Sequence, residues 1–191
     1  MADSRGVALT FDDGPSPLTA ALLDVLASRE VRATFFLLGQ AVEAHSGDVA
    51  AIRRAGHVIG NHTYDHPHPR GRTEEWLAGQ LQRTNDAIIA AGGEAPTLYR
   101  PPYGERSDAL DRAAASLGLA PVLWDIEPQD WTDPGAEAII ERVVPAAEPG
   151  SVILLHDRYQ GTVDALPVII DRLRTRGLTF VTVPTRQGSR R

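Results

Sequence analysis

Short apolar runs alternate with longer segments of helical periodicity along the whole chain. Seven runs rich in β-branched and aromatic residues predict strands at 6–11, 32–38, 57–61, 97–100, 120–126, 151–156 and 178–183. The segments between them carry apolar stripes of helical spacing, such as the one through Leu77, Leu81, Thr84, Ile88 and Ala91. This alternation predicts parallel strands joined by helical crossovers.

Capping residues predict where several of these helices begin. Serine, threonine or aspartate at the N-cap and proline in the first turn are typical of helix starts. Such signals stand at Ser16 with Pro17, at Ser107, at Asp133 with Pro134, and at Thr162.

An open doubly wound sheet and a closed barrel both fit the strand–helix pattern. The chain has 191 residues, whereas an eight-fold barrel usually needs about 250, so a barrel here would be trimmed or irregular. The length suits one core, and the absence of a long polar linker predicts a single domain over 1–191 with its core at about 7–183. The basic tail 184–191 is predicted to be disordered.

Polar clusters follow five of the predicted strands. They read "DDGP", "NHTYDH", "RPPYG", "DIEPQDW" and "LLHD". Both candidate architectures place active sites at the carboxyl ends of parallel strands. The clusters therefore predict a functional site at this end of the sheet.

Two histidines predict a metal site. His62 and His66 are four residues apart, which on a helical turn places both imidazoles on one face. One carboxylate from the adjacent pair Asp12 and Asp13 completes a three-ligand set with open positions. These ligands suit a divalent metal, zinc first, with cobalt or nickel as substitutes. His45, His57 and His68 are interpreted as ordinary structural or loop residues.

Composition and net charge restrict the kinds of partner and structural bond that we expect for this protein. A net charge of −6 without a Lys/Arg stripe argues against nucleic acid, and the absence of cysteine excludes disulfides and thiolate metal sites. No apolar run reaches the ~18 residues of a membrane span. "MADSRGV" is not a secretory signal, so we expect either an intracellular protein or one whose leader precedes this sequence. The oligomeric state is not readable, and a monomer is compatible with the sequence.

Taken together, the five clusters resemble the motifs of NodB-type polysaccharide deacetylases, carbohydrate esterase family 4. They are "TFDDGP" at 10–15, "HTYDH" at 62–66, "RPPYG" at 100–104, "DIEPQDW" at 125–131 and "LLHD" at 154–157, in the family order. The resemblance covers about residues 7–183. It implies a distorted, trimmed (β/α) barrel of about seven strands and a metal-dependent hydrolase that removes acetyl groups from carbohydrates.

The resemblance also implies a division of roles. Asp13 would join His62 and His66 on the metal, and Asp12 would be the general base, paired with Arg100. His156 would protonate the leaving group.

Four further residues are implied in substrate binding. The backbone N–H of Tyr103, presented by a loop that Pro102 stiffens, would stabilise the oxyanion. Leu155 would line the pocket of the acetyl methyl group. Trp131 is interpreted as either a core residue or a wall of the sugar groove.

One position departs from the family pattern. Glu127 stands where an aspartate is usual, and Pro128 where serine or threonine is usual. We predict that Glu127 partners His156, with Asp125 or Asp130 next in line. Tyr64, Asp65 and Asp125 are candidates for supporting the site residues, without an assigned role.

Several functions remain open at this stage. The expected substrate is an N-acetylglucosamine-containing oligo- or polysaccharide, such as a chitin oligomer or peptidoglycan. The alternatives are O-acetyl hydrolysis on xylan and deacetylation of a small intracellular amino sugar. Two His and one carboxylate also serve Fe(II) oxygenases, but their usual all-β fold does not match. A non-catalytic carbohydrate-binding protein is a remote alternative, because none of the implied ligands, nor the base, is missing.

Overall fold

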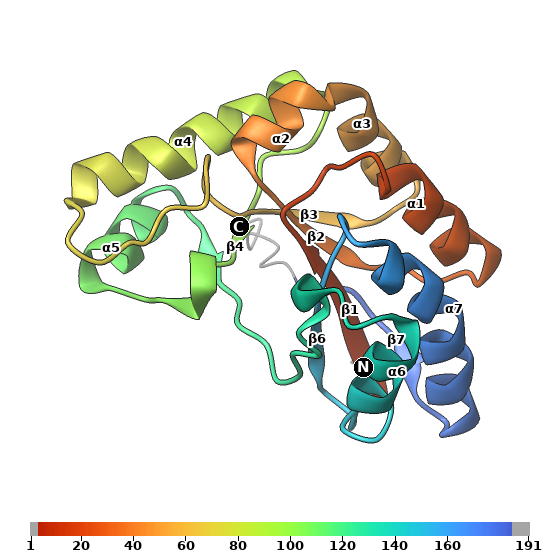
Figure 1. Ribbon diagram of the computed structural model, residues 1–191. Coiled ribbons are helices and arrows are strands. Elements are labelled where there is room, and N and C mark those ends of the chain that lie inside the picture. Colours follow the sequence, from red (N-terminus) through yellow and green to blue (C-terminus); the bar gives the residue numbers. More distant parts are fainter. Residues whose placement is uncertain (1–3, 185–191) are drawn as a thin grey trace.

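A curled parallel sheet with helices on its outer side forms the protein, as seen in a computed structural model that describes residues 4–184 (Figure 1). The sheet has seven strands, in the order β5-β4-β3-β2-β1-β6, with β7 paired to the start of β1. Their bounds are β1 Gly6–Asp12, β2 Thr34–Leu37, β3 Val58–Asn61, β4 Leu98–Tyr99, β5 Ala120–Pro121, β6 Val152–His156 and β7 Thr179–Phe180. Each lies within a predicted run or extends it by one residue, and every strand pair is parallel, as predicted.

The sheet curls into a distorted half-barrel, which confirms the expected fold. The predicted strand 120–126 is split. Its first two residues pair with β4 as β5, and Ile126 then forms a parallel bridge to Ile153 of β6, at the other edge of the sheet. The chain from Pro121 to Ile126 therefore crosses from the β5 edge of the sheet to the β6 edge without forming a continuous strand.

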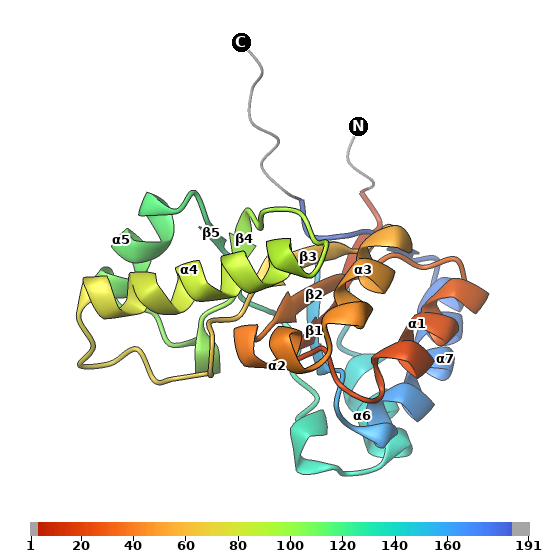
Figure 2. The same cartoon turned by 90° about the horizontal axis from the view of Figure 1, so that it is seen from above.

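The helices cover the outer side of the sheet (Figures 1 and 2). Helices α1, α3, α6 and α7 pack on β1, β2 and β6, whereas α4 and α5 contact each other over the β3–β5 region. Their bounds are α1 Thr19–Ser28, α2 Gly39–Ala44, α3 Ser46–Arg54, α4 Glu74–Ala90, α5 Asp108–Ser116, α6 Ala136–Val143 and α7 Gln160–Thr175, with 3₁₀ turns at Pro102–Gly104 and Asp130–Thr132. No helix of the described residues is long and apolar enough to cross a membrane.

The predicted helix beginnings are only partly right. Ser107 does cap α5, because its Oγ accepts the N–H of Leu110 at 3.1 Å. Thr162 does not open α7, which starts at Gln160, because the threonine hydroxyl instead donates to Asp130. Helix α1 starts at Thr19 and α6 at Ala136, each two residues after the predicted proline.

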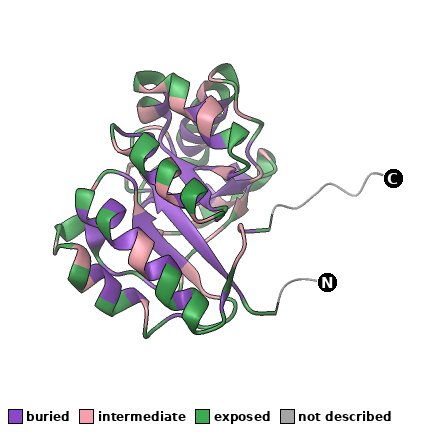
Figure 3. Cartoon of the chain, turned by 90° about the vertical axis from the view of Figure 1, so that its right-hand side faces the viewer, coloured by how far each residue is buried: buried purple, intermediate pink, exposed green. Residues whose placement is uncertain are grey.

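Alternation along the strands separates core from site. In β1, Val7, Leu9 and Phe11 belong to the main hydrophobic core, so Thr10 and Asp12 face the opposite, concave side. Figure 3 shows that this central strand is buried along its whole length. The concave side can therefore carry polar chemistry close to the centre of the molecule. The tail predicted to be disordered, 184–191, lies outside the described residues except for Pro184.

Candidate active site

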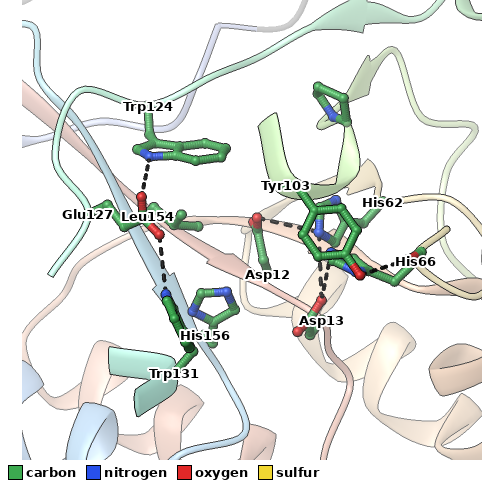
Figure 4. A pocket seen from close by; sticks show the side chains of 11 residues that line it. Asp12, Asp13, His62, His66, Tyr103, Trp124, Glu127, Trp131, Leu154 and His156 are labelled. Atoms are coloured by element: carbon green, nitrogen blue, oxygen red, sulfur yellow. Dashed lines mark hydrogen bonds and ion pairs between the residues drawn. The ribbon is translucent and has the colours of Figure 1, made fainter. Parts of the chain in front are cut away.

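One cavity at the carboxyl ends of the strands brings most of the predicted site residues together (Figure 4). Its volume is about 360 Å³. The lining consists of Asp12, Asp13, His62, His66, Pro101, Tyr103, Trp124, Glu127, Trp131, Leu154 and His156. Each of the five polar clusters contributes two residues to this lining, so all five meet at one edge of the sheet.

The potential metal ligands converge at one side of this cavity. The Nε2 atoms of His62 and His66 lie 3.6 and 3.8 Å from Oδ1 of Asp13. That Oδ1 atom is buried and accepts no hydrogen bond within the protein. An orphaned carboxylate oxygen beside two imidazole nitrogens is an arrangement that a cation satisfies.

The state of the histidines also fits a metal. Nδ1 of His62 lies 2.7 Å from the backbone carbonyl of Arg100 and donates to it, which leaves the Nε2 lone pair free for coordination. Burial lowers the pKa of His62 to about 3, and burial also lowers the pKa of His66. Neutral imidazoles are the form that binds metals. Asp13, His62 and His66 thus fit a divalent ion.

The histidine segment is a loop rather than the predicted helical turn. Thr63 and His66 have positive φ angles of 69° and 58°, which no helical turn contains. Polar side chains of β3 and α4 hold this loop: Asn61 accepts the N–H of Thr63 at 2.8 Å, and Gln80 accepts the N–H of Tyr64 at 3.0 Å. The two histidines do lie together with Asp13, but a loop brings them there rather than the helical turn that their spacing predicted.

Asp12 and Arg100 form a buried ion pair behind the metal ligands. Nη1 of Arg100 lies 2.8 Å from Oδ1 of Asp12, and neither side chain is more than 3% exposed. Nη1 also donates to Thr10, while Nε and Nη2 donate to the carbonyls of Val122 and Leu123. The guanidinium is therefore fixed by four hydrogen bonds and fixes Asp12 in turn.

Asp12 is a carboxylate suited to accept a proton. Burial raises its pKa, and the charges of Arg100 and His156 offset that rise only in part. Its other oxygen, Oδ2, lies 3.6 Å from Nε2 of His62, next to the ligand cluster.

His156 is partnered by Asp130, so the prediction of Glu127 is wrong. Oδ1 of Asp130 lies 2.8 Å from Nδ1 of His156, and Oδ2 accepts the backbone N–H of His156 and the hydroxyl of Thr162. Burial lowers the pKa of His156, but the hydrogen bond and charge of Asp130, together with the charges of Asp12 and Asp13, outweigh it and raise the pKa above its usual value. Asp130 is fully buried, whereas Glu127 faces solvent at the cavity wall.

Leu155 does not line the cavity, and the prediction is corrected to Leu154. Residues alternate along a strand, so Leu154 shares the concave face with His156 while Leu155 packs into the main core. The register supports this, because Thr10 pairs with Leu154 and Asp12 with His156. In the loop after β4, Pro101 lines the cavity rather than the predicted Pro102.

Aromatic side chains form the outer walls of the cavity (Figure 4). Trp131 is 49% exposed, which settles its interpretation as a groove wall rather than a core residue. Tyr103 is 53% exposed and packs edge to face on His66, with ring centroids 4.5 Å apart. Trp124, which the sequence analysis did not single out, stands on the same side as Trp131. An aromatic residue just before the "DIEPQDW" cluster was the available signal.

The remaining polar residues of the motifs support the site from outside the cavity. Asp157 is fully buried; burial raises its pKa to about 6, and its Oδ2 accepts the Thr19 hydroxyl at 2.6 Å. A Cβ atom at Gly14 would lie 2.3 Å from that Oδ2, which explains the glycine after the two aspartates. The hydroxyl of Tyr64 donates to Glu43, and Asp125 accepts the N–H of Val152.

Comparison with known proteins places these features in a family. The family model described as polysaccharide deacetylase matches residues 2–122. A peptidoglycan-N-acetylglucosamine deacetylase from Bacillus cereus is 42% identical over 94% of this chain and 67% of its own length. A chitooligosaccharide deacetylase from Rhizobium leguminosarum bv. trifolii is 38% identical over 96% of this chain and 92% of its own length. A solved structure of a family 4 carbohydrate esterase from Streptomyces lividans in complex with acetate is 38% identical, covers 98% of this chain and 97% of its own, and superposes with a TM-score of 0.91.

Proposed function

The chain belongs to the polysaccharide deacetylase family, and on that premise we propose that it hydrolyses the N-acetyl groups of an N-acetylglucosamine-containing oligo- or polysaccharide. The observation that carries the proposal is the joint placement, in one cavity, of the ligand cluster, the paired base Asp12 and the paired acid His156. Amide hydrolysis needs all three, because water is a poor nucleophile and an amide anion is a poor leaving group.

We assign the metal site to Asp13, His62 and His66, and zinc is the metal that this ligand set fits best. A bound divalent metal supplies Lewis-acid polarisation of the acetyl carbonyl and acidifies a coordinated water. The orphaned Oδ1 of Asp13 and the fixed tautomer of His62 support this assignment.

Asp12 is the proposed general base. Its carboxylate stands beside the ligand cluster, with Oδ1 held by Arg100 and Oδ2 directed toward His62. As the water attacks, Asp12 accepts its proton. Burial raises the pKa of this carboxylate, which makes it a stronger base for the transfer.

His156 is the proposed general acid. Asp130 binds Nδ1, so the opposite ring nitrogen, Nε2, is the atom that delivers a proton to the departing amine. The raised pKa favours the protonated imidazole, the form that a general acid needs.

The walls of the cavity suit an acetylated sugar. Leu154 offers a small apolar contact for the acetyl methyl group, and the exposed rings of Trp131 and Tyr103 offer faces for pyranose rings. We assign oxyanion stabilisation to the backbone N–H of Tyr103, whose φ of 59° lies in the left-handed region directly after two prolines.

Acetate release tests the proposed function. The protein would be incubated with N-acetylated chitooligosaccharides, and in parallel with O-acetylated xylan, each with zinc or cobalt and each after chelator treatment. Metal-dependent release from the chitooligosaccharides is the expected result. Release from xylan alone would replace the proposal by an O-acetyl esterase, and release that survives complete metal removal would refute the metal assignment.

The replacement Asp130→Asn is expected to move the alkaline limb of the kcat profile to lower pH. A general acid is active while protonated, so activity falls as the pH rises through the pKa of His156. Removing an adjacent carboxylate lowers that pKa by about one to three units, because burial, which lowers it, is then opposed only by the charges of Asp12 and Asp13. The measurement is kcat from pH 5 to 10 at saturating metal.

Two neighbouring carboxylates supply the controls for this measurement. Asp125 accepts the N–H of Val152, and Glu127 contacts two indoles, so neither touches His156. Asp125→Asn and Glu127→Gln should leave the alkaline limb in place. A shift of that limb in Glu127→Gln with none in Asp130→Asn would restore the partner that the sequence predicted.

A further inference from the structure

Glu127 occupies the cavity wall in a fixed position without taking part in the proposed proton transfers. Its Oε2 accepts the indole N–H of Trp124 at 3.3 Å, and its Oε1 accepts that of Trp131 at 3.2 Å. Figure 4 shows the carboxylate between the two rings, across the cavity from Tyr103 and His66. Two rigid aromatic donors therefore hold a solvent-facing carboxylate beside the aromatic wall.

The carboxylate of Glu127 retains capacity to accept further hydrogen bonds. An ionised carboxylate has about four lone-pair sites, and the two indoles use one on each oxygen. Sugar hydroxyl and amide N–H groups are donors of the kind that would fill the others. Stacking of a pyranose ring on Trp131 would bring such donors to this carboxylate.

The negative charge of Glu127 is also uncompensated by a cation. Asp12 is paired with Arg100, and Asp13 faces the proposed metal site and Arg158. Within residues 4–184 no Lys, Arg or His nitrogen lies within 4.0 Å of the Glu127 carboxylate, and its two indole donors are neutral. The tryptophan wall of the cavity therefore presents a net negative charge to the substrate.

We propose that Glu127 is a specificity-determining residue that selects against sugars carrying a carboxylate and favours neutral ones. It accepts hydrogen bonds from a neutral sugar, whereas a carboxylate offers no donor and is repelled. The inference rests on the proposed deacetylase function and deepens it, since it separates unsubstituted N-acetylglucosamine chains from glycans with free acidic substituents.

The test compares three tetrasaccharides that differ in whether they carry lactyl groups and in whether the lactyl carboxylate is free or capped. One contains N-acetylglucosamine alone. The second alternates N-acetylglucosamine with N-acetylmuramic acid bearing a free lactyl carboxylate, and the third has that carboxylate capped as a methyl amide. We expect the wild-type kcat/KM at low salt to be about tenfold lower for the free acid than for the amide, and Glu127→Gln to bring this ratio close to one.

Controls separate charge from shape. Glu148→Gln removes the same charge from an exposed position before β6, at the opposite end of the sheet, and should leave the ratio unchanged. Glu127→Asp retains the charge and should retain most of the discrimination. Raising the ionic strength to about 0.5 M should also reduce the wild-type ratio, because the Debye length falls to a few ångströms; this arm needs no variant.

The outcomes distinguish failure of this inference from failure of the proposed deacetylase function. A wild-type ratio near one, or an equal ratio in wild type and Glu127→Gln, would overturn the inference while leaving deacetylation intact. An equal loss of activity on all three substrates in Glu127→Gln would assign Glu127 a structural role and overturn it as well. Failure of the metal-loaded wild-type protein to release acetate from any of the three would instead count against the proposed function.

Discussion

Asp12→Asn is expected to lower kcat by about 10²- to 10⁴-fold, the range that general acid–base catalysis contributes, while the protein still binds its metal. Asparagine has nearly the same shape but accepts no proton at neutral pH. Because Asp12 faces the ligand cluster without belonging to it, the three proposed ligands stay in place. The measurements are kcat on an N-acetylated chitooligosaccharide and the molar ratio of bound zinc.

Asp13→Asn is the matched comparison for this prediction. It changes the neighbouring carboxylate in the same way but removes a proposed ligand, so bound metal and activity should fall together. If Asp12→Asn lost the metal and Asp13→Asn retained it, the two aspartates would have to exchange roles. Retention of near-normal activity in Asp12→Asn would remove the base assignment altogether.

Arg100→Met is expected to lower the free energy of unfolding by about 3–5 kcal/mol, the usual cost of removing one partner from a buried ion pair. The guanidinium is fully buried and makes four hydrogen bonds, which methionine cannot replace. Denaturant unfolding in the presence of a chelator measures this effect without a contribution from bound metal.

The destabilisation should depend on pH. The pKa of Asp12 is already raised in the folded protein, and loss of Arg100 raises it further. The folded variant then binds more protons than the unfolded chain between the two pKa values, so its stability falls as the pH rises from 3.8, the ordinary pKa of the group, through the folded value. Wild type and variant should therefore differ more at pH 7 than at pH 4.

A double-mutant cycle tests whether the pair is responsible. Arg100→Met combined with Asp12→Asn leaves no buried charge at this point, so the double variant should be more stable than the sum of the single effects predicts. Simple additivity, or a destabilisation of Arg100→Met that does not vary with pH, would show that the arginine acts through packing against Phe36 rather than through Asp12.

The strands, and the chemical groups that follow them, could be predicted from the sequence. Strong apolar runs separated by helical stripes identified all seven strands, because the period of burial is a local property of the chain. His62 and His66 were predicted as metal ligands from their residue type and spacing, and Asp13 from the resemblance of the motifs to the family; the structure brings the three side chains together. The buried pair of Asp12 and Arg100 was likewise anticipated from the motifs.

Which of several nearby residues fills a role within a motif depends instead on long-range packing. Asp130 rather than Glu127 partners His156, because the 3₁₀ turn at Asp130–Thr132 directs the aspartate inward and leaves the glutamate between two indoles. Leu154 rather than Leu155 lines the cavity, because strand alternation allows only one of the two to share the face of His156. Moving by one residue along a strand places the side chain on the other face of the sheet. The pairing of β6 with β1 fixes which residues face the cavity, and this long-range pairing cannot be read from the local sequence.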